Sequence, residues 1–223
     1  MYCAIIGDII NSKELIKDKR REIQKELSEI LKIINYEYIN VIASKFLITI
    51  GDEFQGLLSS PDHIIKIVDM IQFAVHPVKI RFGVGIGDIV TDINKEMSIG
   101  ADGPAYHNAR KMIDNLKLIK NGKMSGSSNI LIYSNEIDDV KLLDLLNINL
   151  QLCSFIESKW TEKQRQLIKM IYMEQRNQLE AAAELKIAQS SVQRRLKSAG
   201  YYDFLNARNL VSKCLGILWG NVK

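Results

Sequence analysis

Apolar and polar residues alternate along the chain in patterns that predict a succession of strands and helices. Tyr2 to Gly7 is a short apolar run that ends at Asp8, as expected of a buried strand whose end reaches solvent or a ligand. From Ser12 to Tyr36, apolar residues recur at helical spacing and predict an amphipathic helix packed on a sheet. Alternation from Phe46 to Leu58, interrupted at Gly51-Asp52, predicts a hairpin with a two-residue turn of type II′.

The same reasoning extends the pattern to residue 152. Residues 61–75 and 104–119 have helical spacing, residues 78–89 and 129–133 are typical of strands, and residues 136–152 return to helical spacing. The order strand, helix, hairpin, helix, strand, helix, strand predicts an α/β (α+β) sandwich with a mixed sheet.

Gly83, Gly85 and Gly87 occupy alternate positions of the predicted strand 78–89 and therefore lie on one face of it. Three positions without side chains allow a close approach to the backbone. Two interpretations stay open, a closely packed helix or the base of a bound nucleotide.

The composition is that of a globular protein and changes the picture little. Of 223 residues, 47% are hydrophobic and 25% charged, which excludes a disordered chain and a small disulfide-stapled scaffold. No apolar run approaches the roughly 18 residues of a membrane span, so we expect no membrane partner. Cys3, Cys153 and Cys214 lack metal-binding spacing and suit a reducing compartment, so we expect a cytoplasmic protein.

The positive charge is concentrated near the C-terminus. Residues 157–223 hold 12 Lys/Arg and 6 Asp/Glu, whereas residues 1–156 hold 18 and 20. This distribution favours nucleic-acid contact by the last third of the chain, although a basic surface can also be merely solvated.

Two carboxylates are expected to meet at the end of the predicted sheet. If the hairpin lies beside the first strand, Asp8 and Asp52 come together, and Mg²⁺ is the usual partner of such a pair where phosphates are bound. Ile9, Asn11 and Ser12 then lead into a helix N-terminus that favours phosphate oxygens. The alternative is that these are turn, cap and hairpin residues.

At this point the sequence resembles known families. The segment GDEFQGLL, residues 51–58, resembles the hairpin of GGDEF diguanylate cyclase domains and of class III nucleotidyl cyclases, with Ile50 in place of the first glycine. IIGDIINSKEL, IRFGVGIGDI and IGADGPAYHNAR resemble further cyclase segments in the same order. Nearly the whole chain is similar to the SatD family of bacterial proteins, through GDI..SK, ASKF.ITIGDEFQGLL and IGADGPAY. The resemblance implies a cyclase/GGDEF-like, ferredoxin-like palm over residues 1–156.

The resemblance also implies a ligand set. Asp8 and Asp52 would be Mg²⁺ ligands, with Glu53 as a further ligand, and a nucleoside triphosphate or other nucleotide would bind beside them. Asn108 and Arg110 are two residues apart instead of the four of class III cyclases, so nucleotide binding is better supported than cyclisation. Arg110 is the residue that we expect to contact phosphate; the alternative for this region is a turn followed by a surface arginine.

Residues 157–223 are predicted to form a small all-α domain with a helix-turn-helix. Ala182, Leu185, Ile187, Val192 and Leu196 have the spacing of that motif and resemble bacterial regulators and the DNA-reading region of sigma factors. The turn position usually held by glycine is Lys186, which predicts a left-handed backbone there. Trp160 and Trp219 flank the segment and are expected to pack its core.

The second helix of this motif would present polar and basic side chains to DNA. They would bind base edges through amides and hydroxyls and phosphates through cations. The residues are Gln189, Ser190, Ser191, Gln193, Arg194 and Lys197. The alternative is a helical appendage that packs on the main domain or forms a dimer.

The leading hypothesis is a regulatory protein that binds a nucleotide and Mg²⁺ and is coupled to DNA binding. One alternative is an active nucleotidyl cyclase or nucleotidyltransferase with a two-metal mechanism. A second alternative is a non-catalytic homodimeric scaffold.

Overall fold

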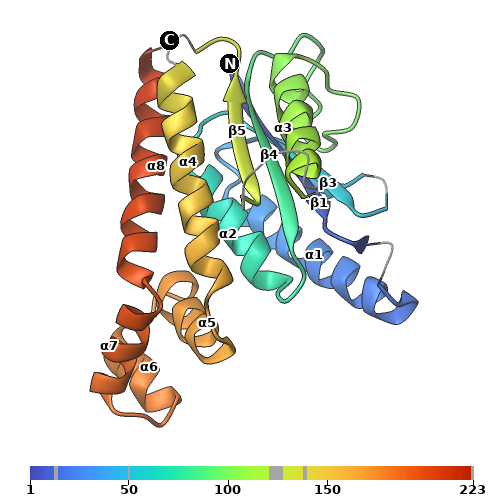
Figure 1. The fold of residues 1–223 in the computed structure, drawn as a ribbon. Coiled ribbons are helices and arrows are strands. Elements are labelled where there is room, and N and C mark those ends of the chain that lie inside the picture. Colours follow the sequence, from blue (N-terminus) through green and yellow to red (C-terminus); the bar gives the residue numbers. More distant parts are fainter. Residues whose placement is uncertain (13–14, 50, 121–127, 138–139, 222–223) are drawn as a thin grey trace.

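The computed structural model describes residues 1–12, 15–49, 51–120, 128–137 and 140–221 (Figure 1). Its first part contains β1 (Tyr2–Ile9), α1 (Lys17–Glu37), β2 (Ile42–Ile48), β3 (Glu53–Leu58), α2 (Ile64–Ala74), β4 (Ile80–Gly87), α3 (Pro104–Lys120), β5 (Ile130–Ser134) and α4 (Val140–Ser158). Its second part contains α5 (Glu162–Ile168), the π-helical turn η2 (Lys169–Met173), α6 (Gln178–Glu184), α7 (Gln189–Ser198) and α8 (Tyr201–Asn221). The predicted order of strands and helices is confirmed. Within these ranges, no helix is long and apolar enough to span a membrane.

The five strands form one mixed sheet in the order β2-β3-β1-β4-β5. The central strand β1 runs antiparallel to both β3 and β4, and β5 runs parallel to β4. A parallel pair needs a long crossover connection, and α3 lies within this one. The prediction of a mixed α/β fold is therefore confirmed.

The hairpin between β2 and β3 has a longer tip than predicted. The Thr49 N–H donates to the carbonyl oxygen of Glu53 over 2.8 Å, so residues 50–52 connect the paired positions and the two-residue turn is wrong. Gly51 has a φ of 68°, a left-handed conformation that favours glycine. Position 50 lies outside the described residues. Alternation along the strands reveals which face a residue occupies, but not how many residues the tip holds.

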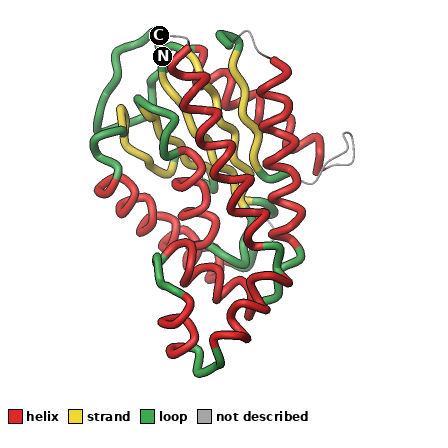
Figure 2. Tube along the Cα trace, turned by 90° about the vertical axis from the view of Figure 1, so that its left-hand side faces the viewer, coloured by secondary structure: helices red, strands yellow, loops and turns green. Residues whose placement is uncertain are grey.

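Helices cover both faces of the sheet (Figures 1 and 2). α3 packs across β1, β4 and β5 on one face, above a small apolar cluster that includes Ala4 and Ile6. The main core lies on the opposite face, where Cys3 and Ile5 of β1 meet buried residues of α1, α2 and α4. Because side chains alternate along β1, neighbouring residues of this strand serve different helices.

α3 lies so close to β4 that only glycine fits beneath it. A Cβ atom at Gly85 would lie 2.0 Å from the carbonyl oxygen of Ala105, and one at Gly83 would lie 2.2 Å from that of Ala109. Both distances are far below van der Waals contact. The alternate glycines therefore make room for a helix, and the interpretation as space for a nucleotide base is wrong at these positions.

The C-terminal helices have a core of their own, but α8 also belongs to the main one. Trp160 and Phe204 lie in a cluster formed mainly by α5, α6, α7 and the start of α8. α8 then runs beside α4, and Val211, Leu215 and Trp219 enter the main core (Figure 1). The expectation that Trp219 packs the C-terminal core is wrong, because a 21-residue helix is about 30 Å long and reaches past it. The division at residues 156 and 157 remains a prediction.

A buried ion pair joins α2 to the C-terminal helices. Arg208 Nη2 of α8 lies 3.2 Å from Asp69 Oδ1 of α2, and each residue is only 2% exposed. The Tyr172 hydroxyl of η2 donates to Asp69 Oδ2 over 2.7 Å. Burial raises the pKa of the Asp69 carboxyl group, and the Arg208 guanidinium opposes that rise. Three elements remote in the sequence therefore depend on one carboxylate.

Candidate functional site

A row of charged residues crosses the sheet near the end of β1. In the strand register, Asp8 lies opposite Glu53 of β3 on one side and Arg81 of β4 on the other. Residues directly opposite each other share a face, and this is the face covered by α3. Asp8 and Arg81 are both buried. The hairpin thus lies beside the first strand, which is the condition under which the sequence brings Asp8 and Asp52 together.

Basic side chains neutralise both carboxylates of this row. Arg81 Nη1 lies 2.5 Å from Asp8 Oδ2, and Lys117 Nζ of α3 lies 3.8 Å from the same oxygen. Arg110, also of α3, donates to the two carboxylate oxygens of Glu53 over 2.5 and 2.6 Å. Hydrogen bonding to Glu53 raises the pKa of the Arg110 guanidinium above its usual value. The row is therefore a network of ion pairs between the sheet and α3.

Asp52 lies beside the end of β1 as well. The Ile9 N–H donates to the backbone carbonyl oxygen of Asp52 over 3.2 Å. The Asp52 carboxylate accepts a hydrogen bond from the buried hydroxyl of Ser12. Asn11, which lies between Ile9 and Ser12 in the sequence, has a left-handed φ of 61°. Ile9 and Ser12 are thus engaged in holding the hairpin, and the phosphate contacts of Ile9, Asn11 and Ser12 remain predictions.

The arrangement of Asp8, Asp52 and Glu53 does not fit Mg²⁺. A magnesium ion requires near-octahedral oxygen ligands at about 2.0–2.1 Å, whereas guanidinium groups contact the carboxylate oxygens of Asp8 and Glu53. Within the described residues, no group of three or more His, Cys, Asp or Glu could hold a metal ion. Arg81 and Arg110 would have to move before a cation could bind, so the metal-ligand roles remain predictions.

Asn108 and His107, near the start of α3, also have protein partners. Asn108 Nδ2 donates to the carbonyl oxygen of Ile86 over 2.9 Å and to Asn135 Oδ1 over 2.8 Å. His107 Nε2 lies 2.7 Å from Asp102 Oδ1, and both side chains are exposed. Asn108 therefore fixes α3 to the sheet, and His107 forms a surface pair.

Sequence reasoning missed Arg81 and Lys117 as partners of Asp8. Both had a signal. Arg81 stands two residues before Gly83, which places it on the glycine face of the strand that α3 covers. Lys117 follows Arg110 by seven residues, so both project from the same side of α3.

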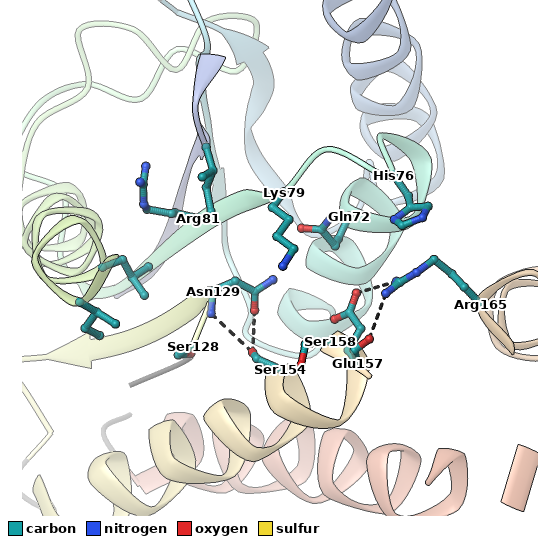
Figure 3. A pocket seen from close by; sticks show the side chains of 13 residues that line it. Gln72, His76, Lys79, Arg81, Ser128, Asn129, Ser154, Glu157, Ser158 and Arg165 are labelled. Atoms are coloured by element: carbon teal, nitrogen blue, oxygen red, sulfur yellow. Dashed lines mark hydrogen bonds and ion pairs between the residues drawn. The ribbon is translucent and has the colours of Figure 1, made fainter. Parts of the chain in front are cut away.

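A cavity of about 440 Å³ lies where β1 ends and β4 and β5 begin (Figure 3). Its lining residues also come from α2, α3, α4 and α5. Lys79, Arg81 and Arg165 line it together with a single acidic residue, Glu157. The cavity is therefore positively charged, and its volume lies within the roughly 300–1,000 Å³ of small-molecule sites.

α7 exposes the polar and basic residues predicted to read DNA. Ser191 is half-buried, and the exposed residues are Gln189, Ser190, Gln193, Arg194 and Lys197. Val192 and Leu196 are buried on its other side. Within the described part of the chain, no carboxylate pairs with Arg194 or Lys197. Lys186, between α6 and α7, has a φ of 53°, so the left-handed backbone expected at this position is confirmed.

The comparisons with known proteins concern the family and the fold. The model of the SatD family matches residues 2–215, and no curated protein matches the chain. The catalytic core of a rhodopsin-guanylyl cyclase with converted specificity, in complex with ATPalphaS, has a TM-score of 0.36 and 21% identity over 50% of this chain and 70% of its own. The guanylate cyclase domain of RhGC from Catenaria anguillulae, in complex with GTP, has a TM-score of 0.35 and 18% identity over 50% and 71%.

A regulator of polyketide synthase expression from Bifidobacterium adolescentis aligns over 96% of this chain and 85% of its own, with a TM-score of 0.29 and 10% identity. TM-scores this low leave the function to be argued from the residues of this chain.

Proposed function

We propose that this chain, which belongs to the SatD family, is a regulatory protein that binds DNA through α7 and a nucleotide on its sheet-bearing part. The observation that carries the proposal is the exposed face of α7, where cations, amides and hydroxyls lie side by side. Arg194 and Lys197 supply charge for phosphates, and Gln189 and Gln193 supply paired donors and acceptors for base edges.

The packing of α7 supports this role. Val192 and Leu196 anchor one side of the helix in the C-terminal core, which leaves the other side free to enter a groove. From Leu185 to Tyr202 the sequence contains no acidic residue that would repel a phosphate backbone.

Removal of two cations from α7 tests the DNA proposal. In the variant Arg194→Ala with Lys197→Ala, we expect DNA affinity to fall about tenfold or more near physiological salt. The slope of log affinity against log salt should flatten by roughly 1.8, because two phosphate contacts no longer release counterions. Fluorescence anisotropy with labelled duplexes at several salt concentrations measures both quantities.

The matched control replaces two exposed lysines on α1, with Lys25→Ala and Lys32→Ala. This variant loses the same charge but should keep the salt slope of the unmodified protein. Equal slopes for the α7 variant and the unmodified protein would show that another surface contacts the phosphates.

Catalysis is not part of the proposed function. The two-metal mechanism of nucleotidyl transfer needs carboxylates that hold cations, and in this chain Asp8 and Glu53 hold guanidinium groups instead. A nucleotide can bind without them, because binding needs only donors for phosphate and an apolar surface for the remainder of the ligand.

A homodimer suits this function, because paired reading helices bind two DNA half-sites about one helical turn, or roughly 34 Å, apart. α4 offers a surface for a second copy. Leu145, Ile148, Leu152 and Phe155 are each more than half exposed, and their 3-4-3 spacing is the seam that a helix presents to an identical helix. The four residues are uncharged, and at one end of the seam Lys159 Nζ lies over the Phe155 ring, 5.1 Å from its centroid.

Charges placed on the seam test the dimer. We expect Ile148→Glu with Leu152→Glu to convert a dimer to a monomer in sedimentation-velocity experiments, because two buried carboxylates per subunit would oppose association. Tyr36→Glu, at a still more exposed position on α1, should leave the dimer intact. A monomer at all accessible concentrations of the unmodified protein would contradict the proposal.

A further inference from the structure

We infer that the cavity at the end of the sheet binds the phosphate group of a small organic phosphate, with Lys79 as its principal charge. This inference rests on the nucleotide part of the proposed function and places the ligand at a different location from the carboxylates Asp8, Asp52 and Glu53. It follows from two hydrogen-bond donors, from the balance of charge and from one apolar wall.

The cavity contains donor groups without acceptors. In the part of the chain that the structure describes, no carboxylate pairs with the exposed Lys79, and Arg81 Nε is buried without a hydrogen-bond partner. Asn129 Oδ1 accepts from the Ser154 hydroxyl over 2.7 Å, which fixes the amide and leaves its Nδ2 donor. In Figure 3 the Lys79 side chain extends toward Asn129. Lys79 and Asn129 thus bring two donors to one space, which suits an anion. The Arg81 guanidinium is turned away from them, toward Asp8 (Figure 3).

The other charges of the cavity are balanced. Arg165 Nη1 lies 2.9 Å from Glu157 Oε1, and Arg81 is paired with Asp8. His76 Nε2 lies 3.1 Å from Glu162. Lys79 therefore supplies the net positive charge, as a point charge of the kind that lysine contributes to phosphate sites.

The remaining wall indicates an organic ligand and not a bare ion. Ile10, Leu116 and Ile119 line the cavity from the end of β1 and from α3. The cavity volume of about 440 Å³ is larger than the volume of a single phosphate ion. It falls within the roughly 300–1,000 Å³ of pockets that bind small organic molecules. A sugar or base can pack on the apolar side while the phosphate meets Lys79.

At Arg165, the cavity adjoins Trp160, whose fluorescence can report ligand binding. The guanidinium of Arg165 lies over the Trp160 ring, 5.3 Å from its centroid. Trp160 Nε1 in turn donates to the carbonyl oxygen of Ala199, immediately after α7, over 2.8 Å. A ligand that shifts Arg165 should therefore change the emission of Trp160 and act on the residue that ends α7.

The test is a titration with ATP, GTP, pyrophosphate and inorganic phosphate in the presence of EDTA. Calorimetry on the unmodified full-length protein measures affinity. The emission of Trp160 is followed separately in Trp219→Phe, which leaves Trp160 as the single tryptophan of the two in the sequence. We expect saturable, metal-independent binding of a nucleotide, accompanied by a change in Trp160 emission.

Two lysine variants locate the ligand. We expect Lys79→Gln to weaken nucleotide binding about tenfold or more, the value of one charge-assisted hydrogen bond. Lys117→Gln is the matched control, because Lys117 lies near Asp8 but outside the cavity lining, and its affinity should be unchanged. The thermal midpoint of each variant without ligand shows that the fold is retained.

The opposite outcomes are distinct. Binding that survives Lys79→Gln but is lost in Asp8→Asn, or that requires Mg²⁺, would overturn the cavity as the site and keep the nucleotide part of the proposed function. Pyrophosphate binding as tightly as ATP would overturn the role of the apolar wall. The absence of any binding would overturn both the cavity site and the nucleotide function, and would leave the DNA proposal to its own test.

Discussion

Replacement of Arg208 by methionine is expected to lower the free energy of unfolding by about 3–5 kcal/mol. The substitution removes the cation beside Asp69 and leaves a buried carboxylate that keeps the Tyr172 hydroxyl as a hydrogen-bond donor and Lys66 as a weaker favourable charge. Chemical denaturation followed by circular dichroism measures the loss. The control is Arg176→Met, which removes exposed pairs with Glu174 and Glu184 and should cost about 1 kcal/mol or less.

The loss should depend on pH in a definite direction. Without Arg208, burial raises the pKa of Asp69 further above its value in the unfolded chain. The Asp69 carboxyl group of the folded variant then binds a proton more tightly than that of the unfolded chain. Protonation of Asp69 therefore stabilises the folded variant at acid pH, and this contribution is lost as the pH rises through the pKa of Asp69 in the folded state. The difference in free energy of unfolding between the unmodified protein and the variant should therefore become smaller as the pH falls from about 7 to about 4.5. A deficit that is equal at both pH values would show that lost packing, and not the stranded charge, causes it.

The second large effect is expected at Gly85. Gly85→Ala should destabilise the protein by about 3 kcal/mol or more, because the new Cβ atom would lie 2.0 Å from the Ala105 carbonyl oxygen and 2.3 Å from the Ala109 nitrogen. Both atoms belong to the backbone of α3, so no side-chain rotation relieves the clash and the helix itself must move. Thermal and denaturant unfolding both report the loss.

Gly216 of α8 provides a control with the opposite sign. The nearest atom to a Cβ at Gly216 is Asp62 Oδ1, at an ordinary contact distance of 3.7 Å. Gly216→Ala should therefore stabilise the protein by about 0.5–1 kcal/mol, because alanine loses less backbone entropy in a helix than glycine. If Gly85→Ala were equally benign, α3 would not be held against β4 as closely as described.

The strand that ends at Asp8 and the hairpin at Asp52 were predictable from the sequence, whereas the partners of the Asp8 side chain had only indirect signals there. The short apolar run and the hairpin pattern predict the two elements, and the structure adds that the hairpin lies beside β1. Whether the Asp8 carboxylate meets a metal ion or a basic side chain depends on the register of β4. That register brings Arg81 opposite Asp8, although the two residues are 73 positions apart in the sequence. Register is set by all pairs of the strands together, so no local pattern reveals it.

The glycines of β4 and Trp219 likewise show that a sequence pattern does not identify the partner that a residue packs against. Alternating glycines indicate a close approach but not what approaches, and only the packing of α3 decides it. Trp219 was assigned to the nearer core by its place in the sequence, yet the length of α8 carries it into the main core. The cavity is lined from the ends of β1, β4 and β5 and from α2, α3, α4 and α5, and its lining residues have no sequence spacing in common.

The path of α8 also determines how the protein can be divided for experiments. Val211, Leu215 and Leu218 complete the apolar core under α4 and α2, although they follow α7, the helix proposed to read DNA, in the sequence. A fragment that ends at residue 156 would expose this apolar surface to water, and a fragment that begins at residue 157 would carry the same side chains without their neighbours. Neither fragment reproduces its half of the molecule, so shortened versions should retain α8 together with the sheet.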